Sequence, residues 1–387
     1  MRYLHRSHGL RWTICSNKQN PLNVFAMIDV QQIEVWMHGR QVGRLALTPQ
    51  RPQTCAFEYT AEWQQDGFSI SPFELPLTPG LKIAPYKPFD GHFGVFSDSL
   101  PDGWGQLILH RHLAQQGINS ASLNPLQQLC LVGSNGRGAL EYRPDQSIQN
   151  TQEYMDLAEI AAESFAILED DNYAGKHIAE LVQRGGSPGG ARPKIFLKQG
   201  NDEWLIKFRA KNDKKSIGRE EYRYSQLAKQ CGIEMPETKL FEDQWFGVRR
   251  FDRVDGRKLH VVSASGLLQA DYQIPSIDYW HLFTISARLS HSMEELWKIF
   301  RLMCFNVLIG NRDDHAKNFS FIYDDKGWRF SPAYDLLPCG TVGDYHTTSV
   351  NDNPLPERAD ILRLAERVGL DVKQATGIYD QMQSMCS

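Results

Sequence analysis

Alternating apolar and polar residues begin the patterned part of the chain. The segment IEVWMHGRQVGRLALT alternates on both sides of residues 38–40, which predicts a β-hairpin. Strand-like residues follow at 56–59, and prolines between 72 and 88 predict loop or extended chain, because proline lacks a backbone N–H. Helical spacing then appears in WGQLILHRHLAQQG, which stops at Gly117, and in a shorter helix that Pro125 opens.

The middle of the chain combines helices with strands. A helix is predicted near 154–169, and the segment IFLKQGNDEWLIKF predicts two strands around a turn at 200–202. A further helix at 219–231 ends before Gly232, and WFGVRRF predicts another strand. These elements together indicate a small lobe of mixed α and β structure.

Helical patterns dominate from residue 260 onward. The segment EELWKIFRLMCFNVLIG is apolar on almost every face, which predicts a central buried helix. The pieces FSFIY and WRFS, joined by the turn DDKG, predict a hairpin inside this helical lobe. The predicted helices are 278–288, 294–309, 355–368 and 371–385.

These patterns predict an α+β fold with a small lobe, a helical lobe and a cleft between them. Residues before 23 lack periodicity and indicate a loose leader, with Met27 as an alternative start to Met1. The expected parts are the leader at 1–24, a β-rich N-terminal subdomain at 25–145, the small lobe at 150–255 and the helical lobe at 256–387.

Composition narrows the class of protein. The 387 residues include 42 basic and 46 acidic side chains, and a net charge of −4 argues against nucleic acid or an anionic membrane as the main partner. The seven cysteines are scattered singly, which argues against a disulfide framework and a structural zinc site. No apolar run reaches the ~18 residues of a membrane span, and the first residues lack the apolar core of a secretory signal. We therefore expect a cytoplasmic protein of a reducing compartment.

The strongest chemical signal is NRDDHAKN, residues 311–318, directly after the predicted buried helix. Kinase-type phosphotransferases use a carboxylate that orients the acceptor hydroxyl and a later carboxamide that binds magnesium, in the order R-D-x-x-x-x-N. Arg312, Asp313 and Asn318 reproduce this spacing. Asp335 in PAYDLLP follows the hairpin, where a second oxygen ligand for the metal is expected. The alternative is an ordinary polar loop, because Asn and Asp favour turns.

Two residues inside this motif each leave two interpretations open. Asp314 is either a spare metal ligand or a solvated turn residue, and we favour the solvated turn. His315 is either a zinc ligand or a loop residue that forms hydrogen bonds. We favour the loop residue, because no Cys or His lies at ligand spacing from it.

A second signal is the glycine-rich segment GGSPGGARPK, residues 185–194. Glycines let backbone N–H groups approach phosphate oxygens, and a nearby lysine neutralises the phosphate charge. The segment is no Walker A loop, because Ala191 follows Gly190 where that motif has lysine. It also matches G-x-S-x-G around Ser187, but Pro188 has no N–H for an oxyanion hole, which disfavours a hydrolase. A flexible linker is the remaining alternative.

A strand lysine and a helix glutamate form the third signal. Lys207 in EWLIKF and Glu221 in the next helix follow the glycine-rich segment. Kinases place in this order the lysine that joins the nucleotide phosphates to a helix glutamate. Singly, each residue is typical of surface charge. The strand residues 248–251 end the small lobe, where a hinge would hold adenine; the alternative there is ordinary core.

Taken in this order, the motifs are similar to those of the HipA-like serine/threonine kinases, the toxin components of bacterial toxin–antitoxin pairs. The resemblance runs from about Ile33 to the final helices. Its N-terminal pieces are VGRLALT, SLPDGWGQLIL and VGSNGRGALEY, and its core pieces are SPGGARPKIFL, EEYRYSQLAK, VRRFDR, LIGNRDDHAKNFS and SPAYDLLP. It implies a bilobal, protein-kinase-like fold with an added N-terminal β-rich subdomain.

The resemblance also implies an ATP- and magnesium-dependent kinase of protein serine or threonine. Asp313 falls on the catalytic aspartate of the family, and Asn318 and Asp335 fall on its metal ligands. Glu221 is the supporting partner of the phosphate-binding lysine. Ser187 falls on a loop serine that the family autophosphorylates, which switches the kinase off. The implied nucleotide-binding residues are Gly189, Gly190, Ala191, Arg192, Lys194, Lys207, Arg249, Phe251 and His315.

Partners follow from the same resemblance. It implies a protein substrate such as an aminoacyl-tRNA synthetase, a HipB-like helix-turn-helix antitoxin, and contact with DNA only through that antitoxin. The chain departs from the usual family residues at Pro188, Arg192, Arg249 and Asp314. Two alternatives stay open, a non-catalytic nucleotide-binding scaffold for an antitoxin or regulator and a small-molecule kinase. The intact set of Arg312, Asp313, Asn318 and Asp335 argues against the scaffold.

Overall fold

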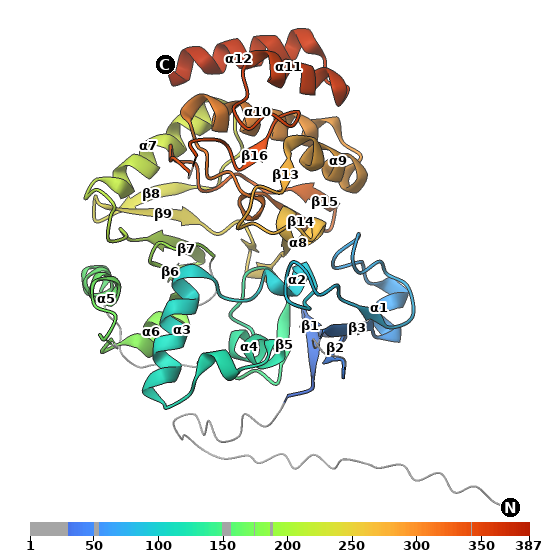
Figure 1. Cartoon of the computed structure of the whole chain (residues 1–387), viewed down its shortest axis with the longest axis vertical. Helices are drawn as coiled ribbons and strands as arrows, with labels where there is room; N and C mark the ends of the chain where they lie inside the picture. Colours follow the sequence, from blue (N-terminus) through green and yellow to red (C-terminus); the bar gives the residue numbers. More distant parts are fainter. Residues whose placement is uncertain (1–29, 50–53, 149–155, 174, 186–188, 342) are drawn as a thin grey trace, which may run out of the picture.

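A computed structural model of the chain describes residues 30–49, 54–148, 156–173, 175–185, 189–341 and 343–387. Three antiparallel sheets of three or more strands, two short strand pairs and the helices around them make up this part of the chain (Figure 1), which confirms a mixed α and β architecture. None of the helices described is both long and apolar enough to cross a membrane. The expected leader at 1–24 and the alternative start at Met27 lie outside the described residues.

The first sheet has the strand order β4-β3-β2-β1-β5 and confirms the predicted hairpin. His38 and Gly39, between β1 and β2, both have positive φ, at 50° and 75°, as the tightest hairpin turns require. Alternate residues of β1, among them Ile33 and Val35, are buried. The strands are β1 (Gln32–Met37), β2 (Arg40–Leu47), β3 (Cys55–Tyr59), β4 (Lys82–Ile83) and β5 (Glu141–Arg143).

Four helices accompany this sheet, and one of them belongs to a different core. Trp104 and Ile108 of α3 pack in a hydrophobic cluster with Ile178 and Ile195, which come from the elements of the second sheet. Helix α3 therefore joins the N-terminal region to the elements that follow it in the chain. The helices are α1 (Ala61–Asp66), α2 (Gly94–Ser97), α3 (Gly103–Gln115) and α4 (Pro125–Val132).

The second sheet has four antiparallel strands in the order β6-β7-β9-β8, with the predicted two-strand turn at 200–201. Helix α6 was not predicted, because it is only eight residues long and ends at Gly185, inside the glycine-rich segment. The strands are β6 (Lys194–Gln199), β7 (Asp202–Lys207), β8 (Thr238–Phe241) and β9 (Trp245–Arg249), and the helices are α5 (Leu157–Glu169), α6 (Ile178–Gly185) and α7 (Ile217–Gln230).

The last part of the chain is mainly helical and carries the third sheet, in the order β12-β14-β15. The hairpin β14–β15 and the buried helix α10 confirm the predictions for this region. The strands are β12 (His260–Ser263), β14 (Ser320–Asp324) and β15 (Gly327–Phe330), with short pairs β10 (Arg253–Val254) and β11 (Arg257–Lys258), and β13 (Ile277–Asp278) and β16 (Thr348–Ser349). The helices are α8 (Ala264–Leu268), α9 (Tyr279–Ser290), α10 (Met293–Ile309), α11 (Arg358–Arg367) and α12 (Val372–Cys386).

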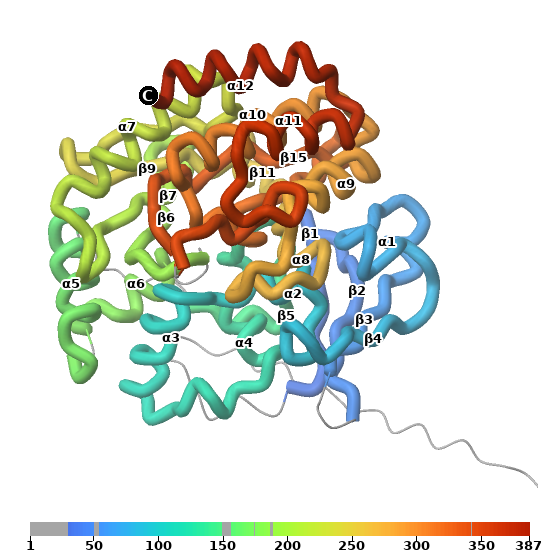
Figure 2. The backbone as a smooth tube through the Cα atoms, turned by 45° about the horizontal axis from the view of Figure 1, so that its top comes forward, coloured from blue at the N-terminus to red at the C-terminus, as the bar shows by residue number. Residues whose placement is uncertain are grey.

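The N-terminal region also packs directly against the last part of the chain. Helices α2 and α8 lie side by side (Figure 2), and a Cβ on Gly94 would stand only 2.3 Å from the carbonyl oxygen of Gly266. Asp98 accepts hydrogen bonds from the backbone N–H and the hydroxyl of Ser263 at 2.6 and 2.7 Å. These contacts fix the connection that leads from α2 to α3, and that connection carries Asp102.

Candidate active site

The loop that carries Asp313 begins where α10 ends. Gly310 closes the helix with a φ of 69°, a conformation that favours glycine. The side chain of Asp313 points into solvent, with 61% of its surface exposed. Its backbone carbonyl accepts a hydrogen bond of 2.6 Å from the side-chain amide of Asn318. The segment 312–318 therefore folds back on itself, and the side chain of Asn318 lies against the backbone of Asp313.

Burial and nearby charges shift the pKa of Asp313. Partial burial raises the pKa of Asp313 above its ordinary value, the nearby imidazole of His315 opposes that shift, and the carboxylate of Asp335 adds to it. The carboxylates of Asp313 and Asp335 are therefore close enough to interact electrostatically. Carboxylate oxygens are ligands that magnesium prefers in proteins.

Asp335 lies in the segment after the hairpin, with a left-handed φ of 58°. Its carboxylate accepts a hydrogen bond of 2.5 Å from Nζ of Lys207, and Lys207 is also 3.1 Å from the carboxylate of Glu221. Burial alone would raise the pKa of Asp335, but the charges of Lys207 and Lys194 hold it well below its usual range. Strand β7, helix α7 and the loop after β15 therefore meet at one lysine.

Glu221 has a second cationic partner that the sequence did not reveal. Arg192 lies 2.8 Å from Glu221 and 2.9 Å from Asp213, so its guanidinium joins the glycine-rich segment to the start of α7. Glu221 is buried and takes both contacts. Arg192, one of the departures from the family pattern, thus forms part of the same charged cluster as Lys207.

The glycine-rich segment is held from the N-terminal region. The backbone N–H of Gly190 donates to Oδ1 of Asp102 at 2.6 Å, and the backbone N–H of Trp104 donates to the carbonyl of Gly190 at 3.0 Å. A Cβ on Gly103 would stand 2.6 Å from the carbonyl oxygen of Gly190, so glycine is needed for this approach. Lys194 donates from Nζ to the carbonyl of Gly189. Residues 186–188, and with them Ser187 and Pro188, lie outside the described residues.

Asp102 reaches a second loop through its other oxygen. Nζ of Lys317, in the short helix Ala316–Asn318, donates to Oδ2 of Asp102 at 2.7 Å. Burial alone would raise the pKa of Asp102, but Lys317 lowers it below its ordinary value. Sequence reasoning missed this pair, although SLPDGWGQ places an aspartate directly before a helix. The contact joins residues 215 positions apart, which no local pattern reveals.

Lys194 is almost fully buried beneath the glycine-rich segment. Burial and, to a smaller extent, the neighbouring ammonium of Lys207 lower its pKa to about 8, against the attraction of Asp335. The side chain lies in a cluster with Lys207 and Asp335 rather than on the surface. A buried cation of this kind is a suitable partner for a phosphate.

The expected adenine hinge follows β9. Arg249 forms an ion pair of 2.6 Å with Asp202, and the ring of Phe251 stacks on Tyr334 with centroids 5.8 Å apart. The next residues form a buried cluster in which Asp252 accepts hydrogen bonds from Arg250, Arg253 and the backbone N–H of Gly138. The motifs VRRFDR and VGSNGRGALEY therefore contact each other in the folded chain.

The prediction of a solvated turn at Asp314 is wrong. Its side chain is fully buried and accepts hydrogen bonds from Tyr279 and His346 at 3.1 Å each, and from the backbone N–H groups of Thr347 and Thr348 at 3.0 and 3.1 Å. All four donors come from other parts of the chain, so the sequence around the motif gives no sign of them. A fully bonded carboxylate can be buried where an isolated one cannot.

His315 lies in the same loop as Asp313, with Nε2 4.0 Å from the aspartate carboxylate. Its Nδ1 accepts a hydrogen bond of 3.2 Å from the backbone N–H of Lys317, as the preferred interpretation of a loop residue requires. In the described ranges, no group of three His, Cys, Asp and Glu side chains could hold a metal ion. A metal between Asn318 and Asp335 therefore has to take its other ligands from phosphate and water, as magnesium commonly does.

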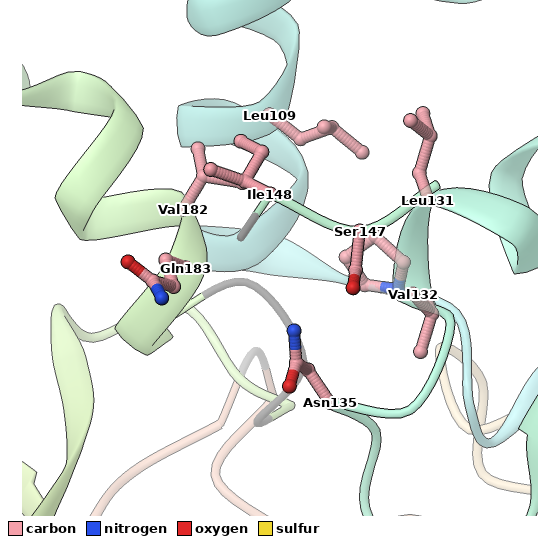
Figure 3. Close-up of a pocket in the computed structure, with 9 residues that line it drawn as sticks. Leu109, Leu131, Val132, Asn135, Ser147, Ile148, Val182 and Gln183 are labelled. Carbon is pink, nitrogen blue, oxygen red and sulfur yellow. The ribbon is translucent and has the colours of Figure 1, made fainter. Parts of the chain in front are cut away.

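A small cavity between α3, α4 and α6 lies apart from this cluster (Figure 3). Leu109, Val132 and Val182 are among its lining residues, and its volume is about 30 Å³. That space holds about one or two water molecules, which is far too little for a nucleotide. The charged cluster, rather than this cavity, is the candidate active site.

Two family models together match most of the chain. The HipA N-terminal domain matches residues 33–143, and the HipA-like C-terminal domain matches residues 186–387. Among individual proteins, the chain is 24% identical over 340 residues to the protein Y4dM of Sinorhizobium fredii, covering 80% of this chain and 78% of that protein. It is 22% identical over 349 residues to the serine/threonine-protein kinase toxin HipA of Shewanella oneidensis, covering 81% and 76%.

A solved structure has the same fold. It is the complex of HipA, HipB and operator DNA from the toxin–antitoxin system of Shewanella oneidensis, and it matches with a TM-score of 0.67 at 20% sequence identity. The match covers 92% of this chain and 88% of the solved chain. At this identity the likeness establishes the fold, and the chemistry rests on the residues of this chain.

Proposed function

The chain belongs to the HipA-like family, and from that premise we propose that it is an ATP- and magnesium-dependent kinase that phosphorylates a serine or threonine of a protein. One observation carries the proposal. Nζ of Lys207 lies 2.5 Å from Asp335 and 3.1 Å from Glu221, so a strand lysine, a helix glutamate and a metal-type aspartate meet at one point. This is the arrangement that phosphoryl transfer by kinases requires.

In this proposal Asp313 orients the acceptor hydroxyl and takes its proton. The hydroxyl oxygen forms a bond to the γ-phosphorus of ATP, the bond to the bridging oxygen breaks, and ADP leaves. The exposed side chain of Asp313 is accessible to an acceptor from another protein. Its raised pKa brings the carboxylate closer to the basicity that proton transfer needs near neutral pH.

Asn318 and Asp335 would hold magnesium. The amide nitrogen of Asn318 donates to the backbone carbonyl of Asp313, which leaves the amide oxygen available as a metal ligand, and the Asp335 side chain is partly exposed. When bound, magnesium neutralises charge on the phosphates. One carboxylate and one carboxamide fit an ion that keeps several waters and phosphate oxygens as ligands.

The glycine-rich segment and the hinge complete the proposed nucleotide site. Residues 189–194 would bind the phosphates through backbone N–H groups, with the Lys194 ammonium beneath them. The backbone of residues 249–251 would receive the adenine. We further propose that Ser187 is autophosphorylated, and that the chain partners a HipB-like antitoxin and acts on a translation component such as an aminoacyl-tRNA synthetase.

Intact mass after incubation with Mg-ATP tests the central proposal. The wild-type protein is expected to gain 80 Da per phosphate on itself or to transfer phosphate to cell-extract proteins, and Asp313→Asn is expected to be about 10²–10⁴-fold slower. ATP binding by Asp313→Asn, measured by calorimetry, should persist. ATP binding by the wild type without transfer to any protein, aminoglycoside or sugar acceptor would instead support the non-catalytic scaffold.

A further inference from the structure

An open groove lies on the outer face of α7, beside the candidate active site. Its volume is about 530 Å³, and it runs between the first half of α7 and the chain just after Asp335. In Figure 1 helix α7 lies beside β8 and β9, at one end of the four-stranded sheet. The lining residues are Lys214, Arg219, Glu220, Arg223, Tyr224, Leu337 and Pro338.

The groove carries positive charge that the described residues do not neutralise. Lys214 and Arg223 are exposed, and neither forms an ion pair with any described carboxylate. Arg219 donates to the backbone carbonyl of Asp243 at 2.8 Å, which satisfies a hydrogen bond but leaves the charge uncompensated. Glu220 is the one carboxylate of the lining, and it accepts a hydrogen bond from Ser216. The result is a cationic site in a chain whose net charge is −4.

The opposite wall of the groove is apolar and connects to the catalytic loop. Leu337 and Pro338 come two and three residues after Asp335. The next residue, Cys339, donates its backbone N–H to the carbonyl of Gly310 at 3.1 Å and accepts from the backbone N–H of Arg312 at 3.2 Å. A molecule in the groove therefore lies next to the loop that presents Asp313.

We propose that this groove binds an acidic segment of the protein acceptor. The carboxylates of that segment would form ion pairs with Lys214 and Arg223, and one of its apolar side chains would pack against Leu337 and Pro338. This inference rests on the proposed kinase function for the role of the bound segment, and on the groove alone for its chemistry. An acidic peptide fits both the charge and the mixed polarity of the lining. Binding there would hold the acceptor near Asp313 while leaving the choice of hydroxyl to the active site.

Nucleic acid fits the lining less well. Single-stranded nucleic acid binds where successive aromatic rings give a stacking surface along a basic channel. The groove has one ring, Tyr224, and the guanidinium of Arg223 stands 4.8 Å from its centre. Glu220 would also face the phosphates. The groove therefore favours a peptide.

The test measures binding without phosphoryl transfer. A fluorescein-labelled peptide of ten residues, rich in Glu and Asp with one Leu and one Ser, is titrated with the full chain, beside the same peptide with Gln and Asn replacing the acids. The double variant Lys214→Glu/Arg223→Glu should bind the acidic peptide at least about tenfold more weakly than wild type. The control Arg288→Glu/Lys373→Glu makes the same change of charge on exposed residues of α9 and α12 and should bind like wild type.

Three further measurements separate the possible outcomes. An equal loss of affinity for the acidic peptide in both double variants, or equal affinity of the wild type for the acidic and the neutral peptide, would show that the groove is not a specific site. Tighter binding of a ten-nucleotide oligouridylate that is lost in the groove variant would replace the acidic peptide with nucleic acid. Autophosphorylation and Mg-ATP affinity of the groove variant should match wild type. A kinase that is active but binds no acidic peptide refutes this inference alone, whereas peptide binding without any kinase activity refutes the proposed function and leaves the groove.

Discussion

Asp102 and Lys317 form an ion pair of 2.7 Å across 215 positions of the chain. The same carboxylate accepts a hydrogen bond of 2.6 Å from the backbone N–H of Gly190, so one side chain of the N-terminal region contacts both the glycine-rich segment and the loop that carries Asp313. Neither contact involves Asp313, Asn318 or Asp335, the residues proposed for proton transfer and metal binding. Asp102 is therefore a positioning residue, and it explains why the N-terminal region belongs to the candidate active site.

Replacing Asp102 should weaken nucleotide binding more than turnover. In Asp102→Asn the amide oxygen can still accept from Gly190, but the charge that holds Lys317 is lost. Loss of about 1–2 kcal/mol of charge-assisted bonding corresponds to a KM for ATP about five- to thirtyfold higher, with kcat changed less. Steady-state kinetics checks this split. Asp66→Asn removes an exposed partner of Arg40 far from the site and serves as control; equal effects of both variants would exclude the positioning role.

Asp335→Ala should abolish magnesium-dependent nucleotide binding. The substitution removes the carboxylate that contacts Lys207 and, in the proposal, one of the two metal ligands. Calorimetric titration with ATP, with and without magnesium, should show a metal-dependent gain in affinity for wild type and no such gain for the variant. Asp325→Ala, in the fully exposed turn of the β14–β15 hairpin, should retain the gain. An unchanged magnesium effect in Asp335→Ala would remove this residue from the metal site.

Nucleotide affinity should fall as pH rises through the pKa of Lys194. Burial, with the charge of Lys207, lowers that pKa to about 8, so the ammonium is mostly charged well below pH 8 and mostly neutral well above it. Phosphates bind the charged form, and the Kd for ATP should therefore rise from pH 7 to pH 9, by at most about tenfold per pH unit. Lys194→Met, which cannot titrate, should bind more weakly throughout and show a flat profile over this range. A parallel rise in the variant would assign the titration to another group.

Substitution of Asp314 should affect stability, whereas substitution of the neighbouring Asp313 should affect phosphoryl transfer. Asp314→Ala leaves Tyr279, His346 and two backbone N–H groups without their acceptor, and should lower the free energy of unfolding by about 3 kcal/mol. Asp313→Ala removes an exposed side chain and should change stability by less than about 0.5 kcal/mol while abolishing phosphoryl transfer. Urea unfolding with both variants checks this contrast, and a similar loss of stability in the two would contradict it.

Sequence reasoning succeeded where the signal is local. The hairpin at residues 38–40 shows as alternation, and the hairpin β14–β15 and helix α10 show as periodicity. The order of the motifs also brought Lys207 and Glu221 into one hypothesis, and the structure places them 3.1 Å apart. The roles of these residues remain predictions that the experiments above test.

Long-range contacts account for what the sequence did not reveal. The burial of Asp314 depends on donors around residue 347 and on Tyr279, and the role of Asp102 depends on Lys317. Arg192 was predicted to bind nucleotide and was noted as a departure from the family pattern, but its ion pair with the glutamate that also binds the strand lysine was not predicted. Polar residues of this kind carry no periodicity, so only the folded chain shows their partners.

The hydrogen bonds of three backbone amides, those of Thr347, Thr348 and Gly190, have a consequence for hydrogen exchange. The amides of Thr347 and Thr348 donate to the buried carboxylate of Asp314, so they should exchange with deuterium slowly whether or not nucleotide is present. The amide of Gly190 donates to Asp102 in an exposed segment and should exchange faster. Added Mg-ATP should slow exchange at Gly190 and leave Thr347 and Thr348 unchanged, which would identify the segment around Gly190 as the part of the site that orders on binding.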